Sequence, residues 1–172
     1  PSRGLGDVYK RQPDNSFDVV INEAMLTMLP LANKEMAVAE YFRVLKPGGV
    51  LLTHDVVVSE QNTEEAVERL RDTIQVKVTP LTESAWTDLF HRSGFRDITT
   101  ISGGMTLLSP RGLIYDEGWR RAFQIVKNAL KAENRETFKR MYRTFNDPAK
   151  PMGYIAVHSR KAADAAMGEQ NA

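Results

Sequence analysis

The clearest structural pattern of this chain lies in residues 13–58, PDNSFDVVINEAMLTMLPLANKEMAVAEYFRVLKPGGVLLTHDVVV. It opens with a turn-like Pro-Asp-Asn-Ser and continues into an apolar run that begins at Phe17 and that only Asp18 interrupts. Near-continuous β-branched runs are typical of strands that are covered on both faces inside a parallel sheet. The pattern therefore predicts an interior strand at 17–22, although almost no sequence precedes it to supply a neighbour.

A helix and a second strand follow. Apolar side chains recur at helical spacing within 34–46, charged side chains such as Lys34 fall largely on the other side, and Asn33 is the expected N-cap. Pro47 and the two glycines after it predict the end of the helix. Residues 50–58 are largely apolar and read as a strand. A strand, a helix and a strand of these lengths predict a βαβ unit with a right-handed crossover.

The rest of the chain continues the alternation of helices and strands. The predicted elements are a helix at 62–75, a helix that Thr82 caps and Gly94 ends, a strand at 95–102, helices at 111–131 and 134–146, and a strand at 152–159. Trp119, Phe123, Val126 and Leu130 share one face of a helix, which is expected to pack on other residues. The helical segment 103–150 interrupts what would otherwise be a hairpin of the last two strands.

Composition restricts the class of protein. The 172 residues are enough for one domain, and 42% apolar with 26% charged residues is ordinary for a globular protein. The formal charge of +1 implies no polyanionic partner, so no nucleic acid is expected. The absence of cysteine excludes disulfides and thiolate metal sites. No apolar run approaches the length of a membrane span, and a cytoplasmic protein that does not bind membranes is expected.

The two ends of the chain are expected to lie outside the domain. Residues 1–12, PSRGLGDVYKRQ, resemble a translated adapter sequence and are interpreted as a non-native or disordered leader. Their Gly-Leu-Gly would suit a phosphate loop only with a strand before it and a helix after it, and neither is predicted. Residues 161–172 are expected to form a solvated tail. The domain is therefore placed at 13–160.

The combination of FDVV and RVLKPGG at this distance resembles the class I S-adenosylmethionine-dependent methyltransferases that act mostly on small molecules. The resemblance extends through 13–58 and continues at 81–95. It implies an α/β fold with the sheet order 3-2-1-4-5-7-6, in which strand 7 is antiparallel. The four predicted strands correspond to strands 4, 5, 6 and 7, so the expected sheet is 4-5-7-6 with a helical insert at 103–150 between strands 6 and 7.

Strands 1 to 3 of the family have no counterpart in this sequence. The glycine-rich turn that holds the methionine part of the cofactor and the acidic residue that holds the ribose would belong to the missing part. The chain is therefore expected to be an N-terminally truncated fragment of a methyltransferase, inactive by itself.

The resemblance implies where S-adenosylmethionine would bind. Open parallel sheets bind ligands at the carboxyl ends of their strands. The residues after strand 4 contact the cofactor in the family, which implies Asn22, Glu23 and Ala24 as cofactor contacts and Thr27 as a fourth. The alternative for Asn22 and Glu23 is capping of the turn that follows, in which case contact through the backbone would remain.

Three side chains at the same edge are candidates for acid–base chemistry: Glu23, His54 and Asp55. Methyl transfer from a sulfonium depends mainly on positioning, and a base is needed only when the acceptor must lose a proton. His54 is alternatively an ordinary pocket-wall residue, and Asp55 alternatively pairs with a cation or caps a loop. A metal site is not expected, because only His91 and His158 remain as histidine ligands.

The acceptor is expected to be a small molecule. Met25 and Met28 are candidates to line an apolar pocket, although methionine also fills gaps in cores. The insert at 103–150 is interpreted as a substrate cap, with Tyr115 and Trp119 as contacts, since inserts at this end of a scaffold often determine specificity. Its basic side chains admit an anionic acceptor or a nucleic acid, but interspersed glutamates favour a solvated face.

A second function from another class is also compatible with the sequence. The strand at 17–22 has one open edge, and a partner chain that adds a strand there would complete the sheet. The protein would then be a non-catalytic α/β module. A nicotinamide-binding half-domain shares the architecture but would require a Gly-x-Gly-x-x-Gly after a strand, which this chain lacks. The oligomeric state does not follow from the sequence.

Overall fold

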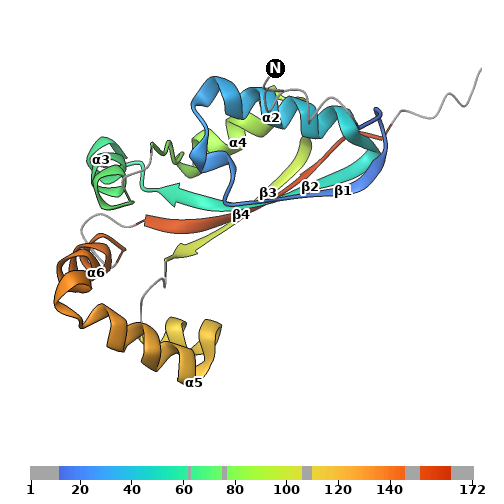
Figure 1. Cartoon of the computed structure of the whole chain (residues 1–172). Helices are drawn as coiled ribbons and strands as arrows, with labels where there is room; N and C mark the ends of the chain where they lie inside the picture. The colour runs from blue at the N-terminus through green and yellow to red at the C-terminus, as the bar shows by residue number, and fades with distance from the viewer. Residues whose placement is uncertain (1–11, 62, 75–76, 106–109, 146–151, 164–172) are drawn as a thin grey trace, which may run out of the picture.

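The computed structural model describes residues 12–61, 63–74, 77–105, 110–145 and 152–163 (Figure 1). The predicted leader at 1–12 and tail at 161–172 lie almost entirely outside these residues. The elements are β1 (Phe17–Glu23), η1 (Leu26–Met28), α2 (Leu31–Val44), β2 (Leu45–Val58), α3 (Thr63–Ile74), α4 (Glu83–Arg92), β3 (Arg96–Gly104), α5 (Pro110–Ala129), α6 (Ala132–Phe145) and β4 (Met152–Arg160).

The four strands form one sheet in the order β1-β2-β4-β3. β1 is parallel to β2, whereas β4 is antiparallel to both β2 and β3. This is the order 4-5-7-6 with an antiparallel strand 7, so the predicted fold is confirmed. The pair Glu23 and His54 ends the β1–β2 ladder, while β2 continues beside β4 as far as the pair Val58 and Met152.

The junction of α2 and β2 differs from the prediction. α2 begins at Leu31 with Pro30 as its N-cap, so Asn33 lies inside the first turn and does not cap it. β2 begins at Leu45, and the Lys-Pro-Gly-Gly segment belongs to the strand, where the register shifts between Phe17 and Val19 of β1. Gly49 serves this close approach, because a Cβ on it would lie 3.1 Å from the Asp18 carbonyl oxygen.

Helix α4 follows the prediction. The Thr82 hydroxyl oxygen accepts the N–H of Ala85 at 3.3 Å, the expected N-cap. Gly94 has a φ of 97° after the last turn, a conformation that costs glycine little. Trp86 is fully buried and its indole N–H donates to the Val56 carbonyl at 3.1 Å, which ties the helix to β2.

The main core lies between one face of the sheet and helices α2 and α4, which Figure 1 shows together on that face. Its buried members are Leu26, Val38, Leu45, Leu51, Trp86, Leu89, Phe90, Phe95, Ile155 and Val157. Burying a large apolar side chain of this kind contributes about 1.5–3 kcal/mol. A second cluster joins α3 to the end of the sheet and consists of Val58, Ala66, Leu70, Val78 and Met152.

The opposite face of the sheet is apolar and open to solvent. We call it the bare face; Val19, Ile21, Leu52 and Ile101 lie on it with 49, 73, 39 and 69% of their surfaces exposed. The prediction that the strand at 17–22 is covered on both faces is therefore wrong within the described residues. The sequence pattern is apolar on both faces, but helices cover only one of them.

Helix α5 also differs from the prediction. Gly118 interrupts it with a φ of 73°. The expected packing face is exposed instead, with Trp119 at 77% and Phe123 at 72%, whereas the small residues Ala122 and Ala129 are buried. The apolar stripe of α5 thus points away from the contacts that the helix makes. Within the described ranges, no helix is long and apolar enough to cross a membrane.

Candidate functional site

The residues that follow β1 form a tight turn at the carboxyl edge of the sheet. The Asn22 side chain is buried, and its Oδ1 accepts the Tyr41 hydroxyl at 3.3 Å. Ala24 has a φ of 51°, and its N–H donates to the His54 carbonyl at 2.8 Å. A positive φ is uncommon for a residue other than glycine, and such backbone strain costs on the order of 1–3 kcal/mol. The structure therefore holds residues 22–24 in one defined conformation.

Asp55 lies beneath this turn rather than in the open. Its Oδ2 accepts the N–H groups of Leu26 at 3.0 Å and Thr27 at 3.2 Å, and its Oδ1 accepts the Val56 N–H at 2.8 Å. The residue is 3% exposed. These contacts are those of a residue that caps a loop, which was one of the roles expected for Asp55. A catalytic role of Asp55 remains a prediction.

Lys34 is a charged residue of this site that the sequence analysis placed on the polar side of α2. It is fully buried, and its Nζ donates to the carbonyl oxygens of Leu29 and Thr79, each at 2.6 Å. Burial lowers its pKa to about 8, and the nearby Asp55 carboxylate offsets part of this effect. The sequence does contain one sign of this burial: Lys34 precedes the buried Val38 by one helical turn and so lies on the same face of α2.

Several buried polar atoms near the turn have no hydrogen-bond partner among the residues that the structure describes. They are Asn22 Nδ2, Thr27 Oγ1 and Thr53 Oγ1. Buried polar groups are normally satisfied, so atoms of this kind need a water or a ligand. Two of them belong to residues that the family resemblance assigns to the cofactor. Together with the strained backbone of Ala24, they fit one wall of a site for a polar cofactor.

Glu23 and His54 lie on the other face of the sheet from Asn22 and Asp55. They are register partners at the end of the β1–β2 ladder, and the His54 ring lies 5.8 Å from the ring of Tyr154, centroid to centroid. His54 lines a cavity of about 280 Å³ on the bare face, together with Ile21, Leu52, Thr53, Thr99, Ile101, Ala156, Val157 and His158. The alternation of side chains along β1 and β2 thus divides the catalytic candidates between two faces.

The candidates for acceptor contacts are all exposed. Met25 and Met28 lie on the turn with 54 and 43% exposure, whereas Tyr115 and Trp119 lie on α5 with 91 and 77%. None of the four lines the cavity on the bare face or the one between α3 and α6. The larger cavity lies between α3 and α6, and no sequence pattern indicated it.

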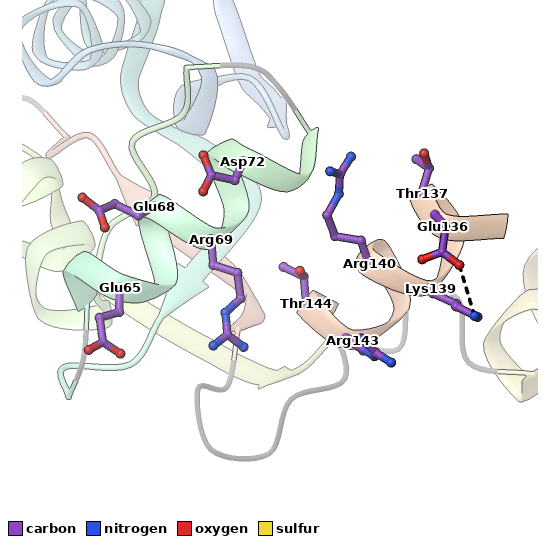
Figure 2. A pocket seen from close by; sticks show the side chains of 10 residues that line it. All are labelled: Glu65, Glu68, Arg69, Asp72, Glu136, Thr137, Lys139, Arg140, Arg143 and Thr144. Carbon is purple, nitrogen blue, oxygen red and sulfur yellow. Dashed lines mark hydrogen bonds and ion pairs between the residues drawn. The ribbon is translucent and has the colours of Figure 1, made fainter. Parts of the chain in front are cut away.

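This cavity, the α3–α6 groove, has a volume of about 710 Å³ (Figure 2). Its lining consists of four acidic and four basic side chains and two threonines: Glu65, Glu68, Asp72, Glu136, Arg69, Lys139, Arg140, Arg143, Thr137 and Thr144. Lys139 and Glu136 form an ion pair at 3.2 Å. The charges balance, so the groove favours neither a simple anion nor a simple cation. Among the described residues, no cluster of His, Asp and Glu could hold a metal ion.

Comparisons with known proteins agree with this architecture. Residues 5–53 match the family model of a methyltransferase domain. A Galdieria sulphuraria protein assigned as a sarcosine dimethylglycine methyltransferase superposes with a TM-score of 0.61 at 19% identity, covering 88% of this chain and 56% of that protein. Phosphoethanolamine N-methyltransferase 2 of Haemonchus contortus, solved with S-adenosylmethionine, gives 0.59 at 19% identity, with 88 and 34% coverage. The chain has the fold of the class I methyltransferases, as its motifs implied.

A nearer relative comes from Haemophilus influenzae. It is 58% identical over 148 residues, which are 86% of this chain and 59% of that protein. The relative is described as uncharacterized and therefore adds no activity. The chain thus spans about three fifths of the length of the relative that it matches.

Proposed function

We propose that the protein to which this chain belongs transfers a methyl group from S-adenosylmethionine to a small-molecule acceptor. The observation that carries the proposal is the rigid turn after β1, at the carboxyl edge of a sheet with methyltransferase strand order. The family match at residues 5–53 supports it, because that segment includes β1 and the turn.

Asn22, Glu23, Ala24 and Thr27 are the residues proposed to hold the cofactor. The unpartnered Asn22 Nδ2 and Thr27 Oγ1 are polar groups that need a partner, and the backbone at Ala24 is already fixed. When bound, the cofactor supplies a methyl group on a positively charged sulfur. The chain contributes orientation, and orientation alone can supply about 7–11 kcal/mol of a barrier.

Glu23 or His54 is proposed as the base where the acceptor must lose a proton. A base needs a free lone pair within hydrogen-bond reach of that proton. Glu23 and His54 lie at the exposed end of the ladder. Asp55 is less suited to this role, because its carboxylate oxygens already accept three backbone N–H groups.

The acceptor is proposed to bind between the turn and the helical insert. Met25 and Met28 would meet it from the turn, and the exposed Tyr115 and Trp119 from α5. The α3–α6 groove lies beyond the carboxyl end of β2, on the side where open α/β sheets receive ligands. Its lining includes none of these four residues, so the groove is an alternative position for an acceptor, and its mixed charges suit one that carries both a positive and a negative group.

The 172-residue chain alone is proposed to bind the cofactor weakly and to catalyse no methyl transfer. The whole protein is proposed to be cytoplasmic. Two fifths of the Haemophilus influenzae relative lie outside the match, and the bare face is uncovered. Isothermal titration with S-adenosylhomocysteine tests this. The full-length relative is expected to bind at micromolar concentration, and this chain at least a hundredfold more weakly. Equal affinities would contradict the proposed inactivity, and no binding by either protein would contradict the methyltransferase proposal.

The open edge of β1 favours a second candidate, a non-catalytic module completed by a partner chain. Ile21 is 73% exposed, and among the described residues β1 has a neighbouring strand on one side only. An unpaired strand edge is a template for another strand. Amide exchange of residues 17–22 that slows only in a heteromeric complex would support this candidate. A monodisperse chain with slow exchange at 17–22 would contradict it.

A further inference from the structure

We propose that Lys34 and Asp55 are positioning residues that clamp the turn at 24–29 from its two ends. The side chains reach the turn from different elements, α2 and β2, and both bind its backbone. The clamp follows from the contacts of the described residues. Its role in orienting the proposed cofactor contacts of the turn rests on the proposed function.

The Asp55 carboxylate holds the beginning of the turn. Oδ2 accepts two consecutive N–H groups, from Leu26 at 3.0 Å and from Thr27 at 3.2 Å. These amides open the short helix η1 and have no partner inside it. Bonds from N–H groups to an ionised carboxylate are roughly twice as strong as bonds between neutral groups. The side chain of Leu26, fully buried in the main core, fixes the same point from another direction.

The Lys34 ammonium holds the end of the turn. Nζ donates to the Leu29 carbonyl oxygen at 2.6 Å and, on its other side, to the Thr79 carbonyl oxygen at 2.6 Å. The Thr79 N–H donates back to the Thr27 carbonyl oxygen at 2.8 Å. The segment before α4 is thereby joined to the turn at two points. A lysine at this position links three parts of the chain through backbone oxygens alone.

Burial of both charges makes the two ends of the clamp interdependent. Lys34 is 0% exposed and Asp55 is 3% exposed, and the Asp55 carboxylate favours the charged form of Lys34 electrostatically. An isolated buried charge is costly, and removing one member of a buried set of opposite charges leaves the other uncompensated. Opening the turn at either end would therefore leave a buried charge without its partners. The conformation of the turn at 24–29 is therefore fixed before any ligand binds.

Amide hydrogen exchange on the unmodified 172-residue chain tests the clamp without any substitution. The amides of Leu26, Thr27 and Thr79 are expected to exchange as slowly as that of Leu52 in the central strand β2. An exposed surface turn exchanges orders of magnitude faster than a core strand. Exchange of these three amides near the rate of an unprotected peptide would overturn the proposal.

Substitutions then separate positioning from ordinary core packing. Lys34→Met keeps the aliphatic stem and removes the donors, and Asp55→Asn keeps the shape and removes the charge. Each is expected to speed exchange at Leu26, Thr27 and Thr79 at least tenfold more than at Leu52. The control is Val38→Ala, a fully buried position one turn further along α2 that makes no side-chain hydrogen bond. It is expected to speed exchange evenly, and an even effect of Lys34→Met would contradict the clamp.

Titration with S-adenosylhomocysteine tests the link to the cofactor separately. Where the unmodified chain binds it, Lys34→Met is expected to weaken binding at least tenfold and Val38→Ala less than twofold. Equal affinity of Lys34→Met and the unmodified chain, with a loosened turn, would show that the clamp does not orient the cofactor. Absence of binding by both the unmodified chain and the full-length Haemophilus influenzae relative would count against the proposed function, while the exchange rates still decide whether the clamp exists.

Discussion

Gly104 and Gly153 are register partners across β3 and β4, yet only one of them has room for a side chain. A Cβ atom on Gly104 would meet nothing within 4 Å, whereas one on Gly153 would clash with the carbonyl oxygen of Gly103. The obstacle at Gly153 is backbone of the neighbouring strand, which cannot rotate away as a side chain can.

Gly153→Ala is therefore expected to destabilise the fold by about 1–3 kcal/mol, the usual range for overpacking in a well-packed region. Gly104→Ala is the matched control and is expected to stay within about 0.5 kcal/mol of the unmodified chain, as for surface substitutions. Urea unfolding at neutral pH measures both free energies. Equal midpoints of the two variants would show that β3 and β4 can separate locally at no cost.

Lys34 predicts a rise of stability with pH. Its pKa falls from 10.5 in the unfolded chain to about 8 in the fold, so the unfolded state binds more protons between these values. The free energy of unfolding therefore rises as the pH increases from about 8 towards 10.5, by at most about 3 kcal/mol. Urea titrations at pH 7 and pH 10 measure this rise.

Lys34→Met is expected to abolish the rise. Lys46→Met is the matched control, because Lys46 is partly exposed and paired with Asp18 on the surface. It is expected to retain the pH dependence of the unmodified chain. The same slope in Lys34→Met would mean that other groups cause it.

Glu83 links α4 to β3 and should titrate below the usual range. Its carboxylate accepts hydrogen bonds from the hydroxyls of Thr100 at 2.5 Å and Ser102 at 2.8 Å. Both bonds lower the pKa of Glu83, and the bond from Thr100 has the larger effect. The stability that these bonds contribute is present above pH 4.5 and is lost as the pH falls through the lowered pKa. A carbon-13 NMR titration of the carboxyl group measures the value directly.

Thr100→Val is expected to return the pKa of Glu83 towards 4.5, whereas Thr100→Ser, which keeps the hydroxyl, should leave it low. An unchanged value in Thr100→Val would assign the shift to Ser102 alone.

The bare face predicts self-association of the isolated chain. Ile21 and Ile101 are 73 and 69% exposed on it, and contiguous exposed apolar patches promote association. The double substitution Ile21→Lys and Ile101→Glu is expected to lower the binding of a hydrophobic dye and the sedimentation-average mass. Met36→Lys, at a residue that is 71% exposed on α2, is the control and should change neither. A chain that is already monomeric and binds no dye would contradict the prediction.

The sequence was sufficient for those features that depend on local pattern. The strand order was implied by the resemblance that FDVV and RVLKPGG carry to the class I methyltransferases, and the ends of α4 followed from Thr82 and Gly94. The start of β2 could not be predicted, because Gly48 and Gly49 lie inside the strand beside a register shift rather than at a helix end. The spacing of Lys34 from Val38 was a local sign of its burial, but its bond to the Thr79 carbonyl joins residues far apart in the sequence and leaves no local pattern.

The position of β4 has a consequence for how the chain acquires its structure during synthesis. β4 occupies Met152–Arg160 and lies between β2 and β3, which do not touch each other as strands. Until these residues leave the ribosome, β3 has no strand to pair with, and its hydrogen bonds must be made to water or to chaperones. Because the chain is made from its N-terminus, the sheet cannot close until β4 has been synthesised. A nascent chain arrested before Met152 is expected to be the form most vulnerable to proteolysis.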